Sequence, residues 1–258
     1  MEVRYYLGRV PSALHAWLLS RRWFPLFRRF RGGRDWTYDA CRFAGTRDFV
    51  TVFDVGANRG TVSLSLARFF PEAAIHAFEP VAATYAGLRR ACSARPRIFA
   101  HQLALADAPG EVLMETQACS ELNSLRFDAP AAASLSMERV AVTTLSAFCT
   151  REKIAAIDLL KVDAQGFDLA VIRGGESLLR AGLVPFIVAE GGLQPDDTTN
   201  QPFLPLNAYL VAEGYRLAGI YEQLNYGPRL RYLGCFNALY LHPAALEARF
   251  PLARPPQS

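Results

Sequence analysis

From Phe49 onward, the sequence alternates short, strongly apolar runs with longer segments of helical pattern. Such alternation predicts βαβ units, and runs that are apolar throughout are typical of parallel strands covered on both faces. We expect these strands at residues 50–54, 74–78, 97–103, 157–162 and 184–189. The sequence therefore predicts an α/β fold with helices on both faces of a mostly parallel sheet.

The C-terminal third continues this pattern differently. A proline-rich loop at 191–205 and a helix at 206–213 precede two further expected strands, at 215–221 and 236–242. Two strands in succession without a helix predict an antiparallel hairpin at the sheet edge, for a total of seven strands. Residues 111–115 and 139–143 are expected as short extra strands that flank a polar loop around Asn123.

Length and composition are those of one globular domain. The chain has 258 residues, of which 51% are hydrophobic and 20% charged, and its five cysteines are scattered without metal-binding spacing. We expect one domain at 46–258, in the reducing cytoplasm. The net charge is only +4 and no nucleic-acid-binding motif is present, so a nucleic-acid partner is not expected.

Residues 1–45 form a basic, aromatic N-terminal extension in which tryptophans and phenylalanines interleave with arginines. One interpretation is a peripheral contact of residues 14–34 with anionic lipid on the inner membrane face. The preferred interpretation is a helical cover packed on the domain, because aromatic and basic residues alone do not specify a membrane.

A glycine turn follows the first expected strand. Gly56 and Gly60 allow a tight turn and close approach of a ligand, and Asn58 stands where a dinucleotide-binding turn has its second glycine. The carboxylate of Asp54 would repel a pyrophosphate but attract the sulfonium and ammonium of S-adenosylmethionine. The turn therefore favours this cationic cofactor over a nicotinamide dinucleotide.

Two more strand ends fit the same ligand. Glu79 ends the second strand, where its two oxygens can accept the hydroxyls of an adenosine ribose. Leu105, Ala106 and Asp107 end the third strand and offer an apolar ledge with a carboxylate for an adenine edge. We therefore predict that these residues bind S-adenosylmethionine together with Asp54, Gly56, Asn58 and Gly60.

These motifs, together with the run IDLLKVDAQG at 157–166, resemble the FkbM-type methyltransferases over about residues 49–242. The resemblance implies a Rossmann-like class I fold and O-methylation of a sugar, glycolipid or other natural product. Two positions depart from the family pattern: Gln165 stands where the family commonly has Glu, and Asn237 where Asp often precedes the last strand.

The acceptor side is expected after the fourth and fifth strands. Lys161 and Asp163 share one strand face, and Asp163 is the first candidate for the base that takes the hydroxyl proton. The alternative is an internal ion pair that anchors the strand. Glu190, at the end of the fifth strand, is either a second carboxylate of the acceptor site or a solvated strand end.

Three further alternatives stay open. Asp196 or Asp197 could join Asp163 and Glu190 around Mg²⁺, although adjacent loop aspartates more often form turns, so no metal site is predicted. Tyr221, with other tyrosines and arginines near the C-terminal loops, could contact a sugar. The rival functions are a nicotinamide-dependent oxidoreductase and a non-catalytic scaffold that binds the cofactor.

Overall fold

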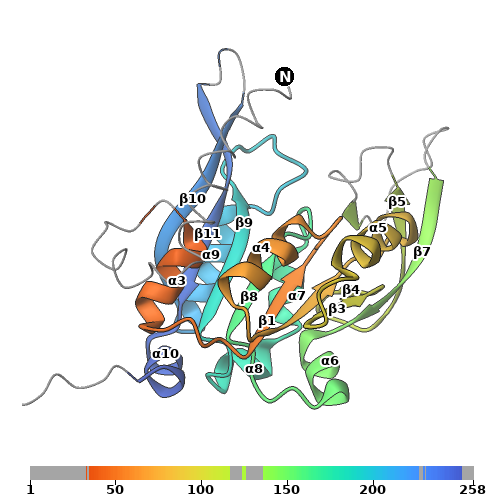
Figure 1. Cartoon of the computed structure of the whole chain (residues 1–258). Coiled ribbons are helices and arrows are strands. Elements are labelled where there is room, and N and C mark those ends of the chain that lie inside the picture. The colour runs from red at the N-terminus through yellow and green to blue at the C-terminus, as the bar shows by residue number, and fades with distance from the viewer. Residues whose placement is uncertain are drawn as a thin grey trace, which may run out of the picture.

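The computed structural model describes residues 33, 35–116, 124–125, 136–226, 229 and 231–251. Within them, the main sheet has seven strands in the order β10-β11-β9-β8-β1-β2-β3 (Figure 1). The strands are β1 (Thr51–Val55), β2 (Ala74–Phe78), β3 (Ile98–His101), β8 (Leu159–Val162), β9 (Phe186–Gly192), β10 (Arg216–Tyr226) and β11 (Tyr232–Leu241). Neighbours pair in parallel from β3 to β9, and β11 pairs antiparallel with both β9 and β10. The predicted sheet and its terminal hairpin are confirmed.

Helices cover both faces of this sheet. The helices are α3 (Trp36–Ala44), α4 (Thr61–Phe69), α5 (Ala82–Cys92), α6 (Leu145–Glu152), α7 (Asp168–Arg173), α8 (Glu176–Arg180), α9 (Phe203–Ala212) and α10 (Pro243–Arg249). Buried residues of α3, α4 and α5 share one core cluster with Val52, Leu159 and Val188 of the strands. Buried residues of α6 to α9 share the other cluster with Phe53 and Leu160. Successive strand residues therefore face opposite helical layers, as a doubly covered sheet requires.

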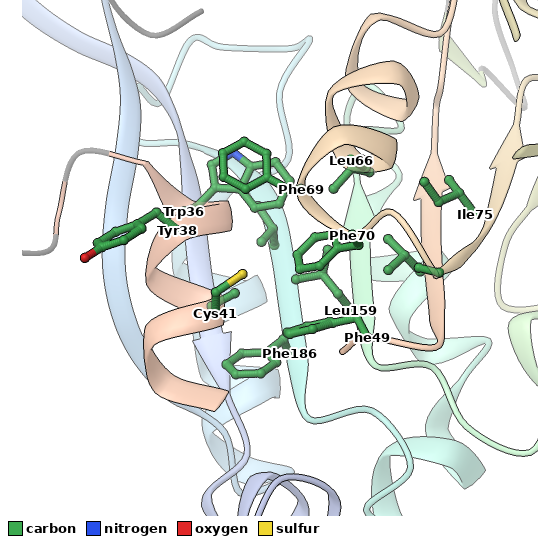
Figure 2. Packing of buried hydrophobic residues seen from close by; sticks show 14 of the residues in the cluster. Trp36, Tyr38, Cys41, Phe49, Leu66, Phe69, Phe70, Ile75, Leu159 and Phe186 are labelled. Carbon is green, nitrogen blue, oxygen red and sulfur yellow. The ribbon is translucent and has the colours of Figure 1, made fainter. Parts of the chain in front are cut away.

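Helix α3, in the predicted N-terminal extension, packs on the domain, as the preferred interpretation of this extension expected. Asp35 caps it by accepting the amide of Tyr38, and Gly45 ends it in the left-handed region. Trp36 and Cys41 lie in the same cluster as Phe70 and Phe186 (Figure 2). Residues 1–32, with most of the candidate membrane segment 14–34, lie outside the described residues, and the domain boundary at residue 45 stays a prediction.

A second, four-stranded sheet stands beside the first, in the order β4-β7-β5-β6. Its strands are β4 (Ala104–Leu105), β5 (Gly110–Thr116), β6 (Ser124–Leu125) and β7 (Ser136–Thr143). The expected strands at 111–115 and 139–143 correspond to β5 and β7, which pair antiparallel. Asn123 lies outside the described residues. Figure 1 shows this sheet beside α5, at the end of the molecule away from the β10–β11 hairpin.

The strand ends differ from the sequence expectation at several places. The expected strand 97–103 ends at His101, and β4 joins the second sheet instead, because Ala104 and Leu105 pair with β7. The expected loop 191–205 is shorter, since β9 runs to Gly192 and α9 begins at Phe203. Gly192 continues the strand because it pairs with Cys235 of β11, a long-range contact that residue composition does not encode. Among the described residues, no helix is both long and apolar enough to cross a membrane.

Candidate cofactor and acceptor site

The turn after β1 is fastened to the ends of β2 and β8. The amides of Gly56 and Ala57 both donate to the carbonyl of Phe78, at 3.0 and 2.9 Å. Gly56 has a φ of 78°, and a Cβ there would lie 1.9 Å from the carbonyl oxygen of Asp163. Only glycine fits this contact. The turn therefore places the predicted cofactor loop directly against the predicted acceptor strand.

Glu79 holds the same turn from the end of β2. Its carboxylate accepts the amide of Asn58 at 3.1 Å and the amide of Val81 at 3.0 Å, one on each oxygen. Burial raises the pKa of Glu79 to about 7, against the opposing effect of these hydrogen bonds. Each carboxylate oxygen can accept a second hydrogen bond, so the ribose-binding role predicted for Glu79 is compatible with its structural one.

Asp54 lies beneath α4 and is only 2% exposed. Its carboxylate accepts a 2.5 Å hydrogen bond from the hydroxyl of Ser63, in the first turns of that helix. Burial raises the pKa of Asp54 to about 6, although Ser63 and the nearby Lys161 act to lower it. Asp54 therefore connects the turn after β1 to α4. Because its carboxylate is buried, it would attract a cationic ligand through its charge and not through direct contact.

At the third predicted strand end, two residues are buried and the third is exposed. Leu105 is buried in the core with Phe78 and Phe148, and Ala106 is buried too. Asp107 is exposed. The apolar ledge predicted for an adenine thus exists as packed core, whereas the carboxylate beside it faces solvent.

On the acceptor side, carboxylates surround one buried ammonium. Lys161 is 2% exposed on β8 and donates to the carbonyl of Val162 at 2.8 Å. Burial acts to lower its pKa, but the carboxylates around it prevail and the pKa is raised. These carboxylates belong to Asp163, Asp168, Glu190 and Asp54. Burial raises the pKa values of Asp54, Asp168 and Glu190, so these carboxyl groups keep their protons to higher pH than they would in solution.

Lys161 and Asp163 form the ion pair that the sequence left as an alternative. The Nζ of Lys161 lies 3.6 Å from a carboxylate oxygen of Asp163, whose side chain is 35% exposed. Gln165, in the left-handed region with a φ of 49°, donates its side-chain amide to the other oxygen at 3.1 Å. The carboxylate of Asp163 is thus held from two sides and still open to a ligand, so pairing and a role toward the acceptor are compatible.

Asp168 belongs to the candidate site and was missed by sequence reasoning. It is fully buried at the start of α7, and its carboxylate accepts the amides of Ala164 and Glu190, each at 3.3 Å. Burial, and secondly the charge of Asp163, raises the pKa of Asp168 to about 7. Asp168 therefore holds the ends of β8 and β9 together. The available signal was a carboxylate just after the glycine turn that follows β8.

Glu190 is half-buried rather than a solvated strand end. Burial, and then the charges of Asp163 and Asp168, raises its pKa to about 8. Its Oε2 is buried without a hydrogen-bond partner. Glu190 therefore holds a proton more readily than an ordinary carboxyl group, at the edge of the cluster and in the region where the acceptor was expected.

In the loop after β9, Asp197 forms a turn with the residues that follow it. Asp197 accepts hydrogen bonds from the amides of Thr199 and Asn200, at 2.9 and 3.0 Å, and from both of their side chains. These bonds lower its pKa against the effect of partial burial. Asp197 is a turn former, and among the described residues no group of three or more histidines, cysteines or acids is placed to hold a metal ion.

Tyr221 does not face a sugar site. It is 3% exposed, and its hydroxyl donates to Asp39 of α3 at 2.8 Å. The same oxygen of Asp39 accepts the amide of Gly33, and Arg42 contacts the other oxygen at 3.1 Å. Tyr221 thus anchors α3 to β10. Tyr232, by contrast, is 56% exposed.

The family model of the methyltransferase FkbM domain matches residues 54–217, which is more than half of the chain. The chain belongs to the FkbM methyltransferase family. The matched region of this FkbM protein contains the turn after β1, Glu79, the Lys161 cluster and Glu190. Its fold is the Rossmann-like class I methyltransferase fold, and its cofactor is S-adenosylmethionine.

Solved structures similar to this FkbM protein include three methyltransferases. Precorrin-6y C5,15-methyltransferase from Geobacter metallireducens GS-15 has 10% identity and a TM-score of 0.44, with 80% of this chain and 86% of that chain covered. Aeropyrum pernix fibrillarin with natively bound S-adenosyl-L-methionine has 15% identity and a TM-score of 0.44, with 74% and 66% covered. The methyltransferase domain of METTL16 has 9% identity and a TM-score of 0.47, with 80% and 66% covered. No curated protein matches the sequence.

The residues present fit this cofactor. Asp54 and Glu79 are buried carboxylates whose pKa values are raised by burial, to about 6 and about 7. A ligand that carries positive charge and hydroxyl donors would offset this cost of burial. When bound, S-adenosylmethionine supplies a methyl group on a sulfonium. Glu79 and the turn at Gly56 to Gly60 would hold its adenosine part, and Asp54 would attract its charge.

Proposed function

We propose that this FkbM-family protein methylates a hydroxyl group of a sugar, glycolipid or other natural product, with S-adenosylmethionine as methyl donor. The observation that supports this proposal is the carboxylate cluster around Lys161, with the pKa of Glu190 raised to about 8. A hydroxyl loses its proton as its oxygen attacks, so a group able to take that proton near neutral pH assists the reaction. The cluster provides such a group next to the cofactor turn.

We assign roles by exposure and contacts. Asp163 is the first candidate for the base or for orienting the hydroxyl, because its carboxylate is 35% exposed and held by Lys161 and Gln165. Glu190 is the second carboxylate and can receive the proton or pass it on. Lys161 holds Asp163 in place. Alignment of the hydroxyl for in-line attack contributes most to the rate, so these residues act chiefly by positioning.

The proposal is tested by labelled transfer. The purified protein is incubated with cofactor carrying an isotope-labelled methyl group and with cell extract, in parallel with extract treated with ribonuclease. We expect label in a ribonuclease-resistant, low-molecular-weight or lipid-soluble product, identified as an O-methyl compound by mass spectrometry. Label found only in RNA would contradict the proposed acceptor, and no label in any fraction would favour the non-catalytic scaffold.

Substitutions then separate chemistry from binding. We expect Asp163→Asn to slow turnover by about a hundredfold, within the usual range for removing an acid–base group, while cofactor affinity by calorimetry stays within about twofold. Unchanged turnover would reject Asp163 as the base. If Glu190 takes the proton instead, turnover rises with pH through about 8, and Glu190→Gln abolishes that rise. Titration with NADH, which we expect not to bind, checks the nicotinamide alternative.

A further inference from the structure

Two buried oxygens without partners lie side by side at the end of the sheet. Among the described residues, three buried side-chain oxygens have no hydrogen-bond partner: Glu190 Oε2, Asn237 Oδ1 and the hydroxyl of Tyr209. Glu190 and Asn237 are directly paired across β9 and β11. Folded proteins rarely leave buried polar atoms unpaired, and two at adjacent positions point to a shared missing donor.

Both side chains lie on the face that carries the cofactor turn and Lys161. Val188, two residues before Glu190, and Leu239, two after Asn237, belong to the cluster under α3 and α4. Side chains two apart along a strand share a face. The same rule places Lys161 on this face, because Leu159 is in that cluster.

The pair is also next to the proposed base. Val162, the last residue of β8, pairs with Ala189, so Asp163 leaves the sheet beside Glu190. The charge of Asp163 acts on Glu190 accordingly. A ligand held by Glu190 and Asn237 would therefore lie within the acceptor side of the site.

The orientation of the Asn237 amide defines what it can bind. Its Nδ2 donates to Glu222 at 2.5 Å, which leaves Oδ1 as a pure acceptor. A flipped amide would set its oxygen against the Glu222 carboxylate. In its charged form Glu190 offers the second acceptor, its Oε2, in addition to the hydrogen bond that its side chain makes with Cys235. Two acceptors on neighbouring strands require two donors, and adjacent hydroxyl groups on one ring supply them.

We propose that Glu190 and Asn237 together bind adjacent hydroxyl groups of the methyl acceptor, next to the hydroxyl that is methylated. This inference rests on the proposed function and narrows its substrate class to compounds with a vicinal diol. Both residues are only partly buried, so part of each side chain is exposed to solvent. Asn237 is a binding residue here, and Glu222 positions its amide.

Periodate provides the chemical test, because it cleaves vicinal diols. Extract is treated with periodate, quenched, and then offered to the wild-type protein with labelled cofactor. We expect the treatment to remove at least about nine tenths of the label incorporated into untreated extract. Transfer that survives periodate would overturn the proposed ligand class.

Variants test the pair itself, with the acceptor fraction from untreated extract as the titrated probe. We expect Asn237→Leu to raise the apparent acceptor KM by about tenfold or more, since an unpaired hydroxyl is costly in a site built to bind it. Its kcat at saturation and its cofactor affinity should stay within about twofold. Asn237→Thr suits a strand and serves if the leucine variant does not fold.

Tyr209→Phe is the matched control, because it removes the third unpartnered oxygen on α9, against the opposite core cluster. It should leave the acceptor KM unchanged. Unchanged KM in both Asn237 variants would show that only water fills this position and would overturn the proposal. Absence of transfer by the wild-type protein would instead reject the proposed function, and the pair with it.

Discussion

The two halves of the site satisfy their polar groups in different ways. At the ends of β1 and β2, Asp54 and Glu79 are bonded to Ser63 and to backbone amides of the chain itself. At the ends of β8 and β9, carboxylates crowd around Lys161, and Glu190 keeps an oxygen without a partner. The cofactor half is complete before its ligand arrives. The half that we propose for the acceptor still has hydrogen-bonding capacity that a ligand could use.

This difference accounts for what each half can reveal. A loop whose polar groups bond within the chain is shaped by the fold, and the same loop can occur in any chain that binds this cofactor. Unsatisfied groups are retained despite their cost to stability, so they report on a specific partner. The cofactor follows from the family, whereas the acceptor has to be read from Glu190, Asn237 and Asp163.

The largest effect is expected from a substitution at Gly56, where the two halves of the site are in direct contact. Gly56→Ala places a Cβ 1.9 Å from the Asp163 carbonyl, at a left-handed φ of 78°. We expect cofactor affinity to fall by about a hundredfold or more and turnover to be lost. Calorimetry with S-adenosylmethionine measures this. Gly110→Ala, where a Cβ meets nothing within 4 Å, is the control. Wild-type affinity in Gly56→Ala would show that the halves do not share this contact.

A smaller effect is expected when one carboxylate of the cofactor half is removed. Asp54→Ala or Glu79→Ala should weaken cofactor binding by about tenfold or more, because the first removes a nearby attractive charge and the second a charge-assisted contact. Calorimetric titration at pH 8, where both groups are charged in the wild type, is the measurement. Glu111→Ala removes an exposed carboxylate of the second sheet and should bind as the wild type does. Equal affinities in all three variants would remove the cofactor role of the two strand ends.

The release of a proton from Glu79 on cofactor binding is a further test of the cofactor half. Glu79 has a pKa raised to about 7, so it is about half protonated at pH 7, and binding to ribose hydroxyls requires its charged form. Cofactor binding at pH 7 should therefore release up to about half a proton from Glu79. The release is measured by titration in two buffers of different ionisation enthalpy. It should vanish above pH 8 and in Glu79→Gln. Uptake of protons on cofactor binding would contradict the role of Glu79 in binding the ribose.

The smallest effect is expected at Asp107. Its side chain is exposed, and solvent competes for any contact with an adenine edge. We expect Asp107→Ala to change cofactor affinity by about threefold or less, as measured by the same titration. A loss as large as that of Glu79→Ala would show that Asp107 belongs fully to the cofactor half.

Sequence patterns predicted the strand, turn and helix of the cofactor half because these elements are adjacent in the chain. A strand, a glycine turn and a helix are encoded locally, and Glu79 follows at the next strand end. The acceptor half depends on pairings between distant segments. Asn237 meets Glu190 only through the β9–β11 register.

Burial was the other property that sequence could not supply. Asp168 was not singled out from the sequence, yet it is fully buried and joins β8 to β9. Tyr221 looked free to bind a sugar, yet it anchors α3 through Asp39. The sequence favoured a helical cover packed on the domain, but it did not single out Trp36 and Cys41 as the residues that pack into the main core.

The place of β11 between β9 and β10 bears on how the protein is made. While the ribosome is still adding the last segment, β9 has an open edge that nothing yet covers, whereas the strands of the cofactor half can already pair. In a nascent chain that ends before Tyr232, the strands of the cofactor half could therefore already be paired. The acceptor half would still lack β11, and β9 would have an unpaired edge. We expect quality control by chaperones to matter most during that interval.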